Sequence, residues 1–206
     1  MSVHVIIGTY RKRKHIEDCL ASMDKRVKNI GDVTIVDDSG DAEHVEWLAQ
    51  YGKVIALDQT GYTTAYRHIC AAAEGREAFV LEEDFTFLSP VDLDYMSEIL
   101  YHRPYLAQLV LLRGPHFPNE HQHGGLIEAL EAKGHRFVDV NGIIEHTACF
   151  SANPGIWRGE VFASGWPYGK WSEELKGKAL RQQGFRFGYV QGIRVEHHGE
   201  RVGHGY

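Results

Sequence analysis

A run of three acidic residues directly after a strand-like segment carries the strongest chemical signal in this sequence. The apolar residues 79–81 are followed by Glu82, Glu83 and Asp84. Two carboxylates that converge at the end of a strand repel each other and raise each other's pKa unless a cation offsets their charge. Mg²⁺ and Mn²⁺ prefer oxygen ligands and bridge phosphate groups. We therefore expect these residues to form either a divalent-metal site or a solvated acidic turn.

A second acidic pair, Asp37 and Asp38, follows another strand-like run at residues 33–36. Strand-like and helix-like segments alternate through the first 90 residues, which is typical of parallel strands joined by crossover helices. Such sheets bind ligands beyond the carboxyl ends of their strands. We therefore predict an α/β fold with a mostly parallel central sheet and helices on both faces. If these two strands are neighbours in the sheet, both acidic clusters should lie in one crevice.

Periodicity and turn residues place the other elements. The segments predicted as strands are 3–8, 54–57, 78–81, 105–112, 137–144 with a break at 141–142, 148–152 and 185–195. The segments predicted as helices are 16–23, 45–49, 63–73 with Thr63 or Thr64 as its cap, 90–101, 126–132, 160–164 and 172–183 with Ser172 as its cap. Residues 114–125, rich in Gly, Pro and His, are predicted as a flexible loop.

Length and composition limit the class of protein. A chain of 206 residues can bury one ample core, and we treat it as one domain. The formal net charge of −6 argues against a protein that coats nucleic acid. Cys19, Cys70 and Cys149 form no C-x-x-C pair, which indicates reduced thiols and a cytoplasmic location. No apolar run approaches the length of a membrane-spanning helix, roughly 18 residues, so we expect no membrane insertion.

Three segments, taken in order, resemble the opening of the family 2 glycosyltransferases of the GT-A fold. They are residues 6–12 (Ile-Ile-Gly-Thr-Tyr-Arg-Lys), 33–40 (Val-Thr-Ile-Val-Asp-Asp-Ser-Gly) and 79–84 (Phe-Val-Leu-Glu-Glu-Asp). The family starts with a strand ending in Thr-Tyr-Asn-Arg, continues with a strand ending in Val-Asp-Asp-Gly-Ser, and carries an Asp-x-Asp-like metal motif on a third strand. This chain has Arg11 in place of Asn, Ser-Gly in inverted order, and glutamates in place of the leading aspartates.

The resemblance implies a single GT-A-like domain over residues 1–206, with a nucleotide-sugar-binding half at 1–90 and an acceptor and catalytic half at 91–206. It implies a metal-dependent, inverting glycosyltransferase that moves a sugar from a UDP-, GDP- or dTDP-linked donor to an acceptor hydroxyl. The cofactor would be Mn²⁺ or Mg²⁺, because a divalent ion on the diphosphate stabilises that leaving group without proton transfer. The acceptor is open, and a hydroxylated base in DNA is one option.

The same resemblance implies the roles of individual residues. The metal ligands would be Asp84, Glu82 and His197, with His198 as the reserve, and an imidazole ligand would favour Mn²⁺ over Mg²⁺. The residues that bind the donor would be Thr9, Tyr10, Arg11, Asp38, Arg67 and Glu83. Tyr10 would lie against the base and Asp38 would bond the base or ribose. Equally, Tyr10 could be a rim aromatic and Asp38 could cap a turn.

The catalytic base is expected at the start of the last helix. The stretch Trp-Ser-Glu-Glu-Leu at 171–175 resembles the family's late Glu-Asp motif, which makes Glu173 or Glu174 the base that deprotonates the acceptor. The same glutamates could simply cap the helix and offset its dipole. An indole from Trp166 or Trp171 could raise the pKa of the carboxylate or stack on a sugar ring.

Other interpretations stay open. One is a non-catalytic nucleotide- or sugar-binding module on the same fold, and another is a nucleotidyltransferase, although residues 8–11 hold one glycine where that class needs several. His116, His121 and His123 could hold zinc or belong to a lid over the site. The basic run at 11–14 is either a solvated start of a helix or a phosphate contact.

Overall fold

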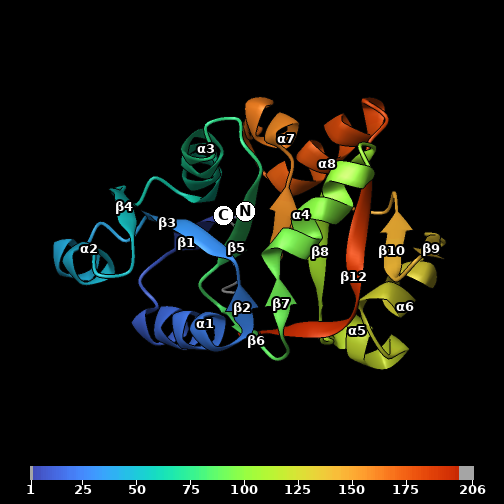
Figure 1. Cartoon of the computed structure of the whole chain (residues 1–206), viewed down its shortest axis with the longest axis horizontal. Coiled ribbons are helices and arrows are strands. Elements are labelled where there is room, and N and C mark those ends of the chain that lie inside the picture. Colours follow the sequence, from blue (N-terminus) through green and yellow to red (C-terminus); the bar gives the residue numbers. More distant parts are fainter. Residues whose placement is uncertain (1, 200–206) are drawn as a thin grey trace.

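The first half of the chain alternates strands and helices, as the sequence predicts. In the computed structural model, which describes residues 2–199, four parallel strands lie in the order β4-β3-β1-β5 (Figure 1). They are β1 (Val3–Thr9), β3 (Ile30–Asp37), β4 (Lys53–Ala56) and β5 (Ala78–Glu82). The helices between them are α1 (Arg13–Arg26), α2 (Ala42–Leu48) and α3 (Tyr62–Ala72). A separate short pair joins β2 (Val27–Lys28) to β7 (Val91–Asp92).

The second half extends the same sheet with mixed pairing. Beyond β5 the order is β11-β8-β12-β10-β9, and β6 pairs with β12. In this part of the sheet β8 and β12 are parallel, whereas the other described pairs are antiparallel. The strands are β6 (Phe85–Phe87), β8 (Leu106–Arg113), β9 (Phe137–Val140), β10 (Ile143–His146), β11 (Gly155–Trp157) and β12 (Arg186–His197). The helices are α4 (Leu93–His102), α5 (Pro118–His123), α6 (Leu126–Glu131), α7 (Gly159–Ala163) and α8 (Ser172–Gln182).

Helices cover both faces of the sheet, as predicted. Successive residues of a strand point to opposite faces, so each buried strand supplies two cores. On one face, Leu20 of α1 and Leu100 of α4 belong to the same core as Ile7 of β1. On the other face, Ile69 of α3 belongs to the same core as Ile6 of β1, together with residues of α7 and α8. The fold is therefore a mixed α/β domain around one sheet.

The register of the parallel strands brings the acidic clusters to one edge of the sheet. Gly8, near the end of β1, pairs with Val36 of β3 on one side and with Glu82 of β5 on the other. The residues that follow these strands, including Asp38 and Asp84, therefore leave the sheet at the same edge. Both acidic clusters thus lie at the carboxyl ends of parallel strands, as predicted, but β1 lies between β3 and β5, so these two strands are not neighbours.

Several predicted helix starts are wrong. Helix α3 begins after Gly61, whose φ of 89° is left-handed, and no side chain caps it, so Thr63 and Thr64 lie inside the helix. Helix α4 begins at Leu93, because the side chain of Asp92 accepts hydrogen bonds from the backbone N–H groups of its first turn. Helix α8 begins at Ser172, as the predicted range has it, but its cap position is Trp171 and no side chain caps the helix, so the assignment of Ser172 as the cap is wrong.

Two predicted loop and strand segments also differ from the structure. Residues 148–152 form no strand, and the short strand β11 lies instead at Gly155–Trp157. Residues 114–125 contain helix α5. Its start is fixed by Glu120, whose Oε2 accepts hydrogen bonds from the backbone N–H groups of His116 (2.8 Å) and Phe117 (3.2 Å).

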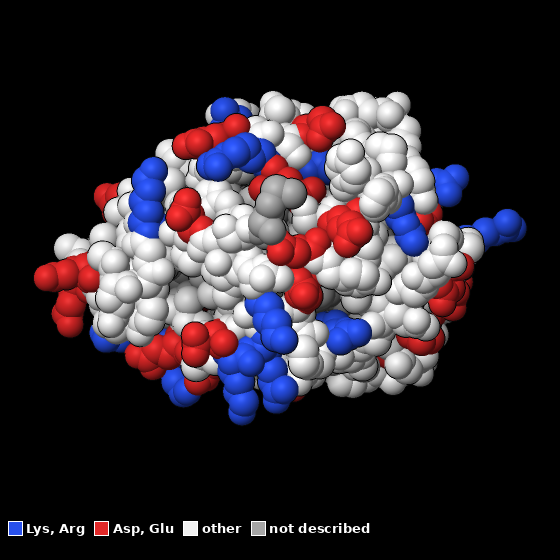
Figure 2. Space-filling view, viewed as in Figure 1, with Lys and Arg blue, Asp and Glu red and all other residues white. Residues whose placement is uncertain are grey.

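The surface carries both signs of charge. In Figure 2, acidic side chains gather over the middle of the face shown, and Lys and Arg side chains gather below them around α1 and β2. The last turn of α1 contains Lys25 and Arg26. Separately, none of the helices described between residues 2 and 199 has the length and apolar character needed to cross a lipid bilayer.

Candidate active site

The aspartate and the histidine expected to hold a metal meet at the edge of the sheet. Asp84 lies in the turn after β5, and His197 is the last residue of β12. Their side chains are 3.3 Å apart, measured from Asp84 Oδ2 to His197 Nε2. His197 reaches this place because the last residues of β12 pair with β6, where His197 lies opposite Phe85. By contrast, His198 bonds Thr86 through Nε2 at 2.8 Å, so His197 is the histidine that approaches Asp84.

Aromatic rings hold this pair in place. The ring of Phe85 stacks on the His197 imidazole with centroids 4.5 Å apart, and the His116 ring lies 4.1 Å from His197. Asp84 Oδ1 and His197 Nδ1 are buried and have no hydrogen-bond partner among the described residues. Burial would raise the pKa of Asp84, but the hydrogen bond and charge of His197 outweigh it and lower the pKa below its ordinary value. Asp84 is thus an ionised carboxylate with an unsatisfied oxygen.

These atoms suit a divalent cation in part. Mn²⁺ accepts both carboxylate and imidazole ligands, whereas Mg²⁺ binds imidazole poorly. Within residues 2–199, no group of three or more His, Cys, Asp or Glu side chains is arranged to hold a metal ion. Asp84 and His197 could therefore supply two ligands, and a bound molecule would have to supply the others.

The neighbouring glutamates have partners within the chain. Glu82 Oε1 accepts a hydrogen bond from Tyr66 Oη at 2.9 Å, and Glu83 Oε1 accepts one from the Tyr10 backbone N–H at 3.2 Å. Burial, followed by the charge of Asp84, raises the pKa of both glutamates, that of Glu83 to about 8. One oxygen of Glu82 is therefore used by Tyr66, and the role of Glu82 as a third metal ligand stays a prediction.

The residues expected to bind the donor nucleotide lie at the ends of β1 and β3. Thr9 ends β1 and has a buried Oγ1 without a hydrogen-bond partner among the described residues. Arg11 donates from Nε to the carbonyl oxygen of Ser39 at 3.0 Å, and its guanidinium lies 5.3 Å from the centre of the Tyr10 ring. This contact ties the loop after β1 to the loop after β3. The nucleotide contacts of Thr9, Tyr10 and Arg11 stay predictions.

Both carboxylate oxygens of Asp38 accept hydrogen bonds from the loop before α3. Its Oδ1 accepts hydrogen bonds from the backbone N–H and the hydroxyl of Thr60, at 2.7 and 2.9 Å, and its Oδ2 accepts one from the N–H of Gly61 at 2.7 Å. This arrangement is the turn-capping alternative, since both carboxylate oxygens already have donors. A contact between Asp38 and a base or ribose stays a prediction.

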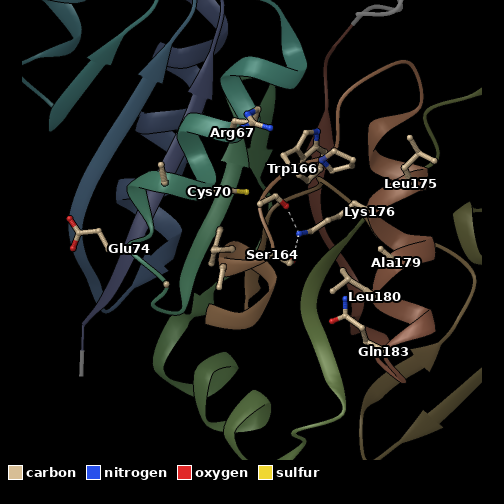
Figure 3. A pocket seen from close by; sticks show the side chains of 16 residues that line it. Arg67, Cys70, Glu74, Ser164, Trp166, Leu175, Lys176, Ala179, Leu180 and Gln183 are labelled. Atoms are coloured by element: carbon tan, nitrogen blue, oxygen red, sulfur yellow. Dashed lines mark hydrogen bonds between the residues drawn. The ribbon is translucent and has the colours of Figure 1, made fainter.

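Arg67 lies apart from the other predicted donor residues. Tyr66 points to Glu82, and one further residue along α3 turns the side chain by about 100° around the helix axis. The Arg67 guanidinium instead lies 4.1 Å from the centre of the Tyr168 ring. Figure 3 shows Arg67 beside a cavity of about 660 Å³ between α3 and α8, which Lys176 also lines. The structure therefore gives no support to the assignment of Arg67 to the donor site.

The structure separates the two candidate bases. Glu173 is half-buried, and its Oε1 accepts a hydrogen bond from the backbone N–H of Ala152 at 3.0 Å, whereas Glu174 is exposed. Burial raises the pKa of Glu173, and the charge of Glu173 in turn helps to raise the pKa of Glu82 and of Tyr66. Of the two glutamates, Glu173 has the position and the environment of a general base.

The two candidate indoles also have different positions. Trp166 is buried, stacks on Tyr66 with centroids 4.3 Å apart, and donates from Nε1 to Ser172 Oγ at 2.9 Å. It therefore supports the hydrogen bond from Tyr66 to Glu82. Trp171 is 65% exposed beside Glu173.

Two cations belong to the site, and sequence analysis gave only one of them a role. The charge of Lys12, in the basic run, opposes the effect of burial on Glu83 and lowers the pKa of Asp84. Its ammonium makes no ion pair or hydrogen bond with any residue between 2 and 199. Arg113, at the end of β8, forms a two-point ion pair with Glu120, at 2.6 and 2.8 Å. The sequence signal for Arg113 is a charged residue at the end of an apolar strand, comparable to the acidic run that follows the apolar residues of β5.

The histidine-rich segment at residues 114–125 has a defined structure and lies beside the site, where His116 contacts His197. Both side chains of the Arg113–Glu120 ion pair are buried. Glu120 also bonds the backbone N–H of His116, and this holds the His116 ring against His197. His121 and His123 lie exposed on α5, where His123 Nδ1 bonds the carbonyl oxygen of Asn119 at 2.7 Å. The three histidines therefore do not converge into a zinc site.

The likeness to known proteins lies in the fold. No protein-family model matches the chain, and no curated protein matches it. A structure of TarS residues 1–349 from S. aureus with UDP-GlcNAc is similar over 100% of this chain and 62% of its own, with a TM-score of 0.63 at 17% identity. GalNAc-T7 with UDP, GalNAc and Mn²⁺ is similar over 100% and 45%, with a TM-score of 0.71 at 13% identity.

A third similar structure is the mannosyltransferase PcManGT from Pyrobaculum calidifontis with GDP-Man and Mn²⁺. It matches 98% of this chain and 58% of its own, with a TM-score of 0.66 at 15% identity. This chain thus spans from under half to three-fifths of the length of these glycosyltransferases. The chain has a GT-A-like fold, with an aspartate–histidine pair at the carboxyl edge of its sheet.

Proposed function

We propose that the protein is a metal-dependent, inverting glycosyltransferase of the family 2 type, with a nucleotide-diphosphate sugar as its donor. The observation that carries the proposal is the approach of Asp84 and His197, from distant parts of the chain, to 3.3 Å at the edge where a parallel sheet binds ligands. The complexes of the similar structures with UDP-GlcNAc, UDP and GDP-Man support this class of donor.

Asp84 and His197 would hold Mn²⁺ on the donor diphosphate, whose oxygens would complete the ligand set. Bound there, the ion would neutralise the charge that builds up on the departing nucleotide diphosphate. Lys12 would add a second positive charge, since its charge lowers the pKa of Asp84 and its ammonium has no partner within the described chain. Residues 1–90 would then form the donor half of the domain, as the sequence predicts.

Glu173 would act as the general base. It would take the proton of the acceptor hydroxyl, whose oxygen would form a bond to the anomeric carbon as the bond from that carbon to the diphosphate oxygen breaks. A single displacement of this kind inverts the anomeric centre. The raised pKa of Glu173, caused by burial, makes this carboxylate a stronger base than an exposed one.

A non-catalytic sugar-nucleotide-binding module is the second candidate. It is favoured by the hydrogen bond that Tyr66 donates to Glu82, which leaves two protein ligands where three were expected. Such a module would bind nucleotide without turnover.

The two functions are tested by one pair of measurements. Thermal unfolding is followed with UDP, GDP and dTDP, each with and without Mn²⁺, and nucleotide release is then measured with the matching sugar donors. A ligand at a hundred times its Kd stabilises a protein by about 2.7 kcal/mol. Stabilisation that needs Mn²⁺, together with nucleotide release, supports the transferase. Stabilisation without release supports the module, and no stabilisation by any nucleotide rejects both.

A further inference from the structure

A second cavity lies beside Glu173. Its volume is about 730 Å³, and its lining includes Glu173, Trp171, Tyr62 and Phe150. Pockets of this size hold small organic ligands of a few rings. Because the proposed base lines this cavity, a molecule bound in it would be placed to present a hydroxyl to Glu173.

Trp171 is the unusual residue in this lining. It is 65% exposed, whereas Trp157 and Trp166 are buried. Its backbone is left-handed, with φ 64° and ψ 31°, a conformation that is costly for a bulky residue. Strain of this kind persists where the surrounding structure imposes it, and it is found often at binding sites. Hydrophobic burial does not account for an indole held in this way.

The charges around the cavity offset one another. Lys133 and Arg181 line it together with Glu173 and Glu174, so basic and acidic side chains are balanced in number. A strongly anionic or cationic ligand would meet repulsion from one of these pairs. A neutral ligand with an apolar face and many hydroxyls would instead stack on an indole and find both donors and acceptors around it. A sugar ring has this chemistry.

We infer that Trp171 is the platform on which a sugar ring of the acceptor stacks, so that the acceptor is a glycoside or glycan. This inference rests on the proposed function for the transfer step, but stacking itself does not need turnover. Trp171 is then a specificity-determining residue for the acceptor, and Glu173 two positions along the chain takes the proton from one hydroxyl of the stacked ring.

The experiment compares three variants of the full chain. Trp171→Ala removes the ring, and Trp171→Tyr keeps an aromatic face. Tyr168→Ala is the matched control, because Tyr168 is equally exposed in the same loop but lies over Arg67, outside this cavity. Thermal unfolding checks that all three fold. The probes are the methyl glycosides of glucose, galactose, mannose and N-acetylglucosamine, and short oligomers of these sugars, with glycerol and ribitol as ring-free polyols.

Two readouts separate this inference from the proposed function. Saturation-transfer NMR measures binding of the probes without a donor, and acceptor kinetics measure KM and kcat with one. We expect a sugar probe to bind the wild type, and Trp171→Ala to weaken that binding or raise the acceptor KM by about tenfold or more. Trp171→Tyr should stay within about threefold of wild type, and Tyr168→Ala should not change it.

The inference is overturned if the ring-free polyols are used in preference to the sugars, if no sugar probe binds, or if Trp171→Ala binds them as the wild type does. Failure of the proposed function has a different signature, because no nucleotide would then bind or be released, whatever the result with the glycosides. Sugar binding that depends on Trp171 in a protein without turnover would support the stacking site within the non-catalytic module.

Discussion

The carboxylate of Asp84 and the imidazole of His197 lie 3.3 Å apart although the two residues are 113 positions apart in the chain. The contact depends on two features of the sheet. Strand β5 ends at the carboxyl edge of the parallel strands, and β12 runs on beyond its pairing with β8 until it pairs with β6. The candidate site thus combines Asp84 from the first half of the chain with His197 from the last described strand.

Replacing Gly199 with alanine should weaken metal-dependent nucleotide binding. A Cβ at this position would overlap Asp84 Oδ2 and would lie 2.7 Å from His197 Nε2, so the side chains of the aspartate–histidine pair would have to move. Disturbing the groups that orient metal ligands costs about 10- to 100-fold in metal affinity. We expect a loss of this size in Mn²⁺-dependent nucleotide affinity, measured by titration calorimetry. Gly114→Ala is the control, since a Cβ there meets nothing within 4 Å.

The two glutamates at the start of α8 should respond differently to substitution. Glu173→Gln removes the proposed base and should lower kcat by about a hundredfold or more, whereas Glu174→Gln changes an exposed residue and should stay within about threefold of wild type. Both variants should bind nucleotide normally. Equal activity of the two variants would reject Glu173 as the base.

Turnover should rise with pH through the ionisation of Glu173. A base must be deprotonated to act, and burial raises the pKa of this carboxyl above its ordinary value of 4.5. We therefore expect half-maximal kcat on the acidic limb at a pH above 4.5, measured at saturating Mn²⁺ and substrates. An acidic limb centred below 4.5 would contradict the assignment.

The Arg113–Glu120 ion pair should make stability sensitive to acid. Burial would raise the pKa of Glu120, but its hydrogen bonds from Arg113 and the neighbouring backbone N–H groups lower it to about 2, below the ordinary 4.5. A lowered pKa stabilises the fold above pH 4.5, and this contribution disappears as the pH falls from 4.5 towards 2.

Glu120→Gln tests that contribution. Leaving one partner of a buried ion pair unpaired costs about 3–5 kcal/mol in the free energy of unfolding. We expect a loss in this range at pH 7 by urea denaturation, and a flatter dependence of stability on pH between 4.5 and 2. The control Glu131→Gln alters an exposed residue nearby and should change stability little. A variant as stable as the wild type would show that the pair does not hold the segment bearing His116.

The first half of the fold could be predicted because each buried strand there is a short apolar run followed by a turn and an amphipathic helix. The second half could not be predicted so well. Strand β11 (Gly155–Trp157) is three residues long and overlaps a turn-like Asn-Pro-Gly sequence, so its pairing with β5 and β8 has no local signal. Helix α5 is hidden by Gly, Pro and His, and it forms because Glu120 bonds the segment preceding the helix and pairs with Arg113.

The candidate site could likewise be predicted from the sequence only in part. The approach of Asp84 and His197 was expected from the resemblance to a family, and the separation of Glu173 from Glu174 required the structure. The hydrogen bonds that Tyr66 and Thr60 donate to Glu82 and Asp38 join separate elements, so no local pattern announces them. A sequence shows which side chains could bind a ligand or react. Hydrogen-bond partners from other elements, such as Tyr66 and Thr60, determine which of those side chains remain available.

Asp84→Asn tests the central claim most directly. Nucleotide release from a panel of UDP-, GDP- and dTDP-sugars is measured with and without Mn²⁺ for the wild type, for this variant, and for the control Asp24→Asn on the exposed side of α1. The proposed function predicts Mn²⁺-dependent turnover by the wild type and the control, and a loss of at least about a hundredfold in Asp84→Asn with an unchanged melting temperature. Near-normal turnover by Asp84→Asn would contradict it.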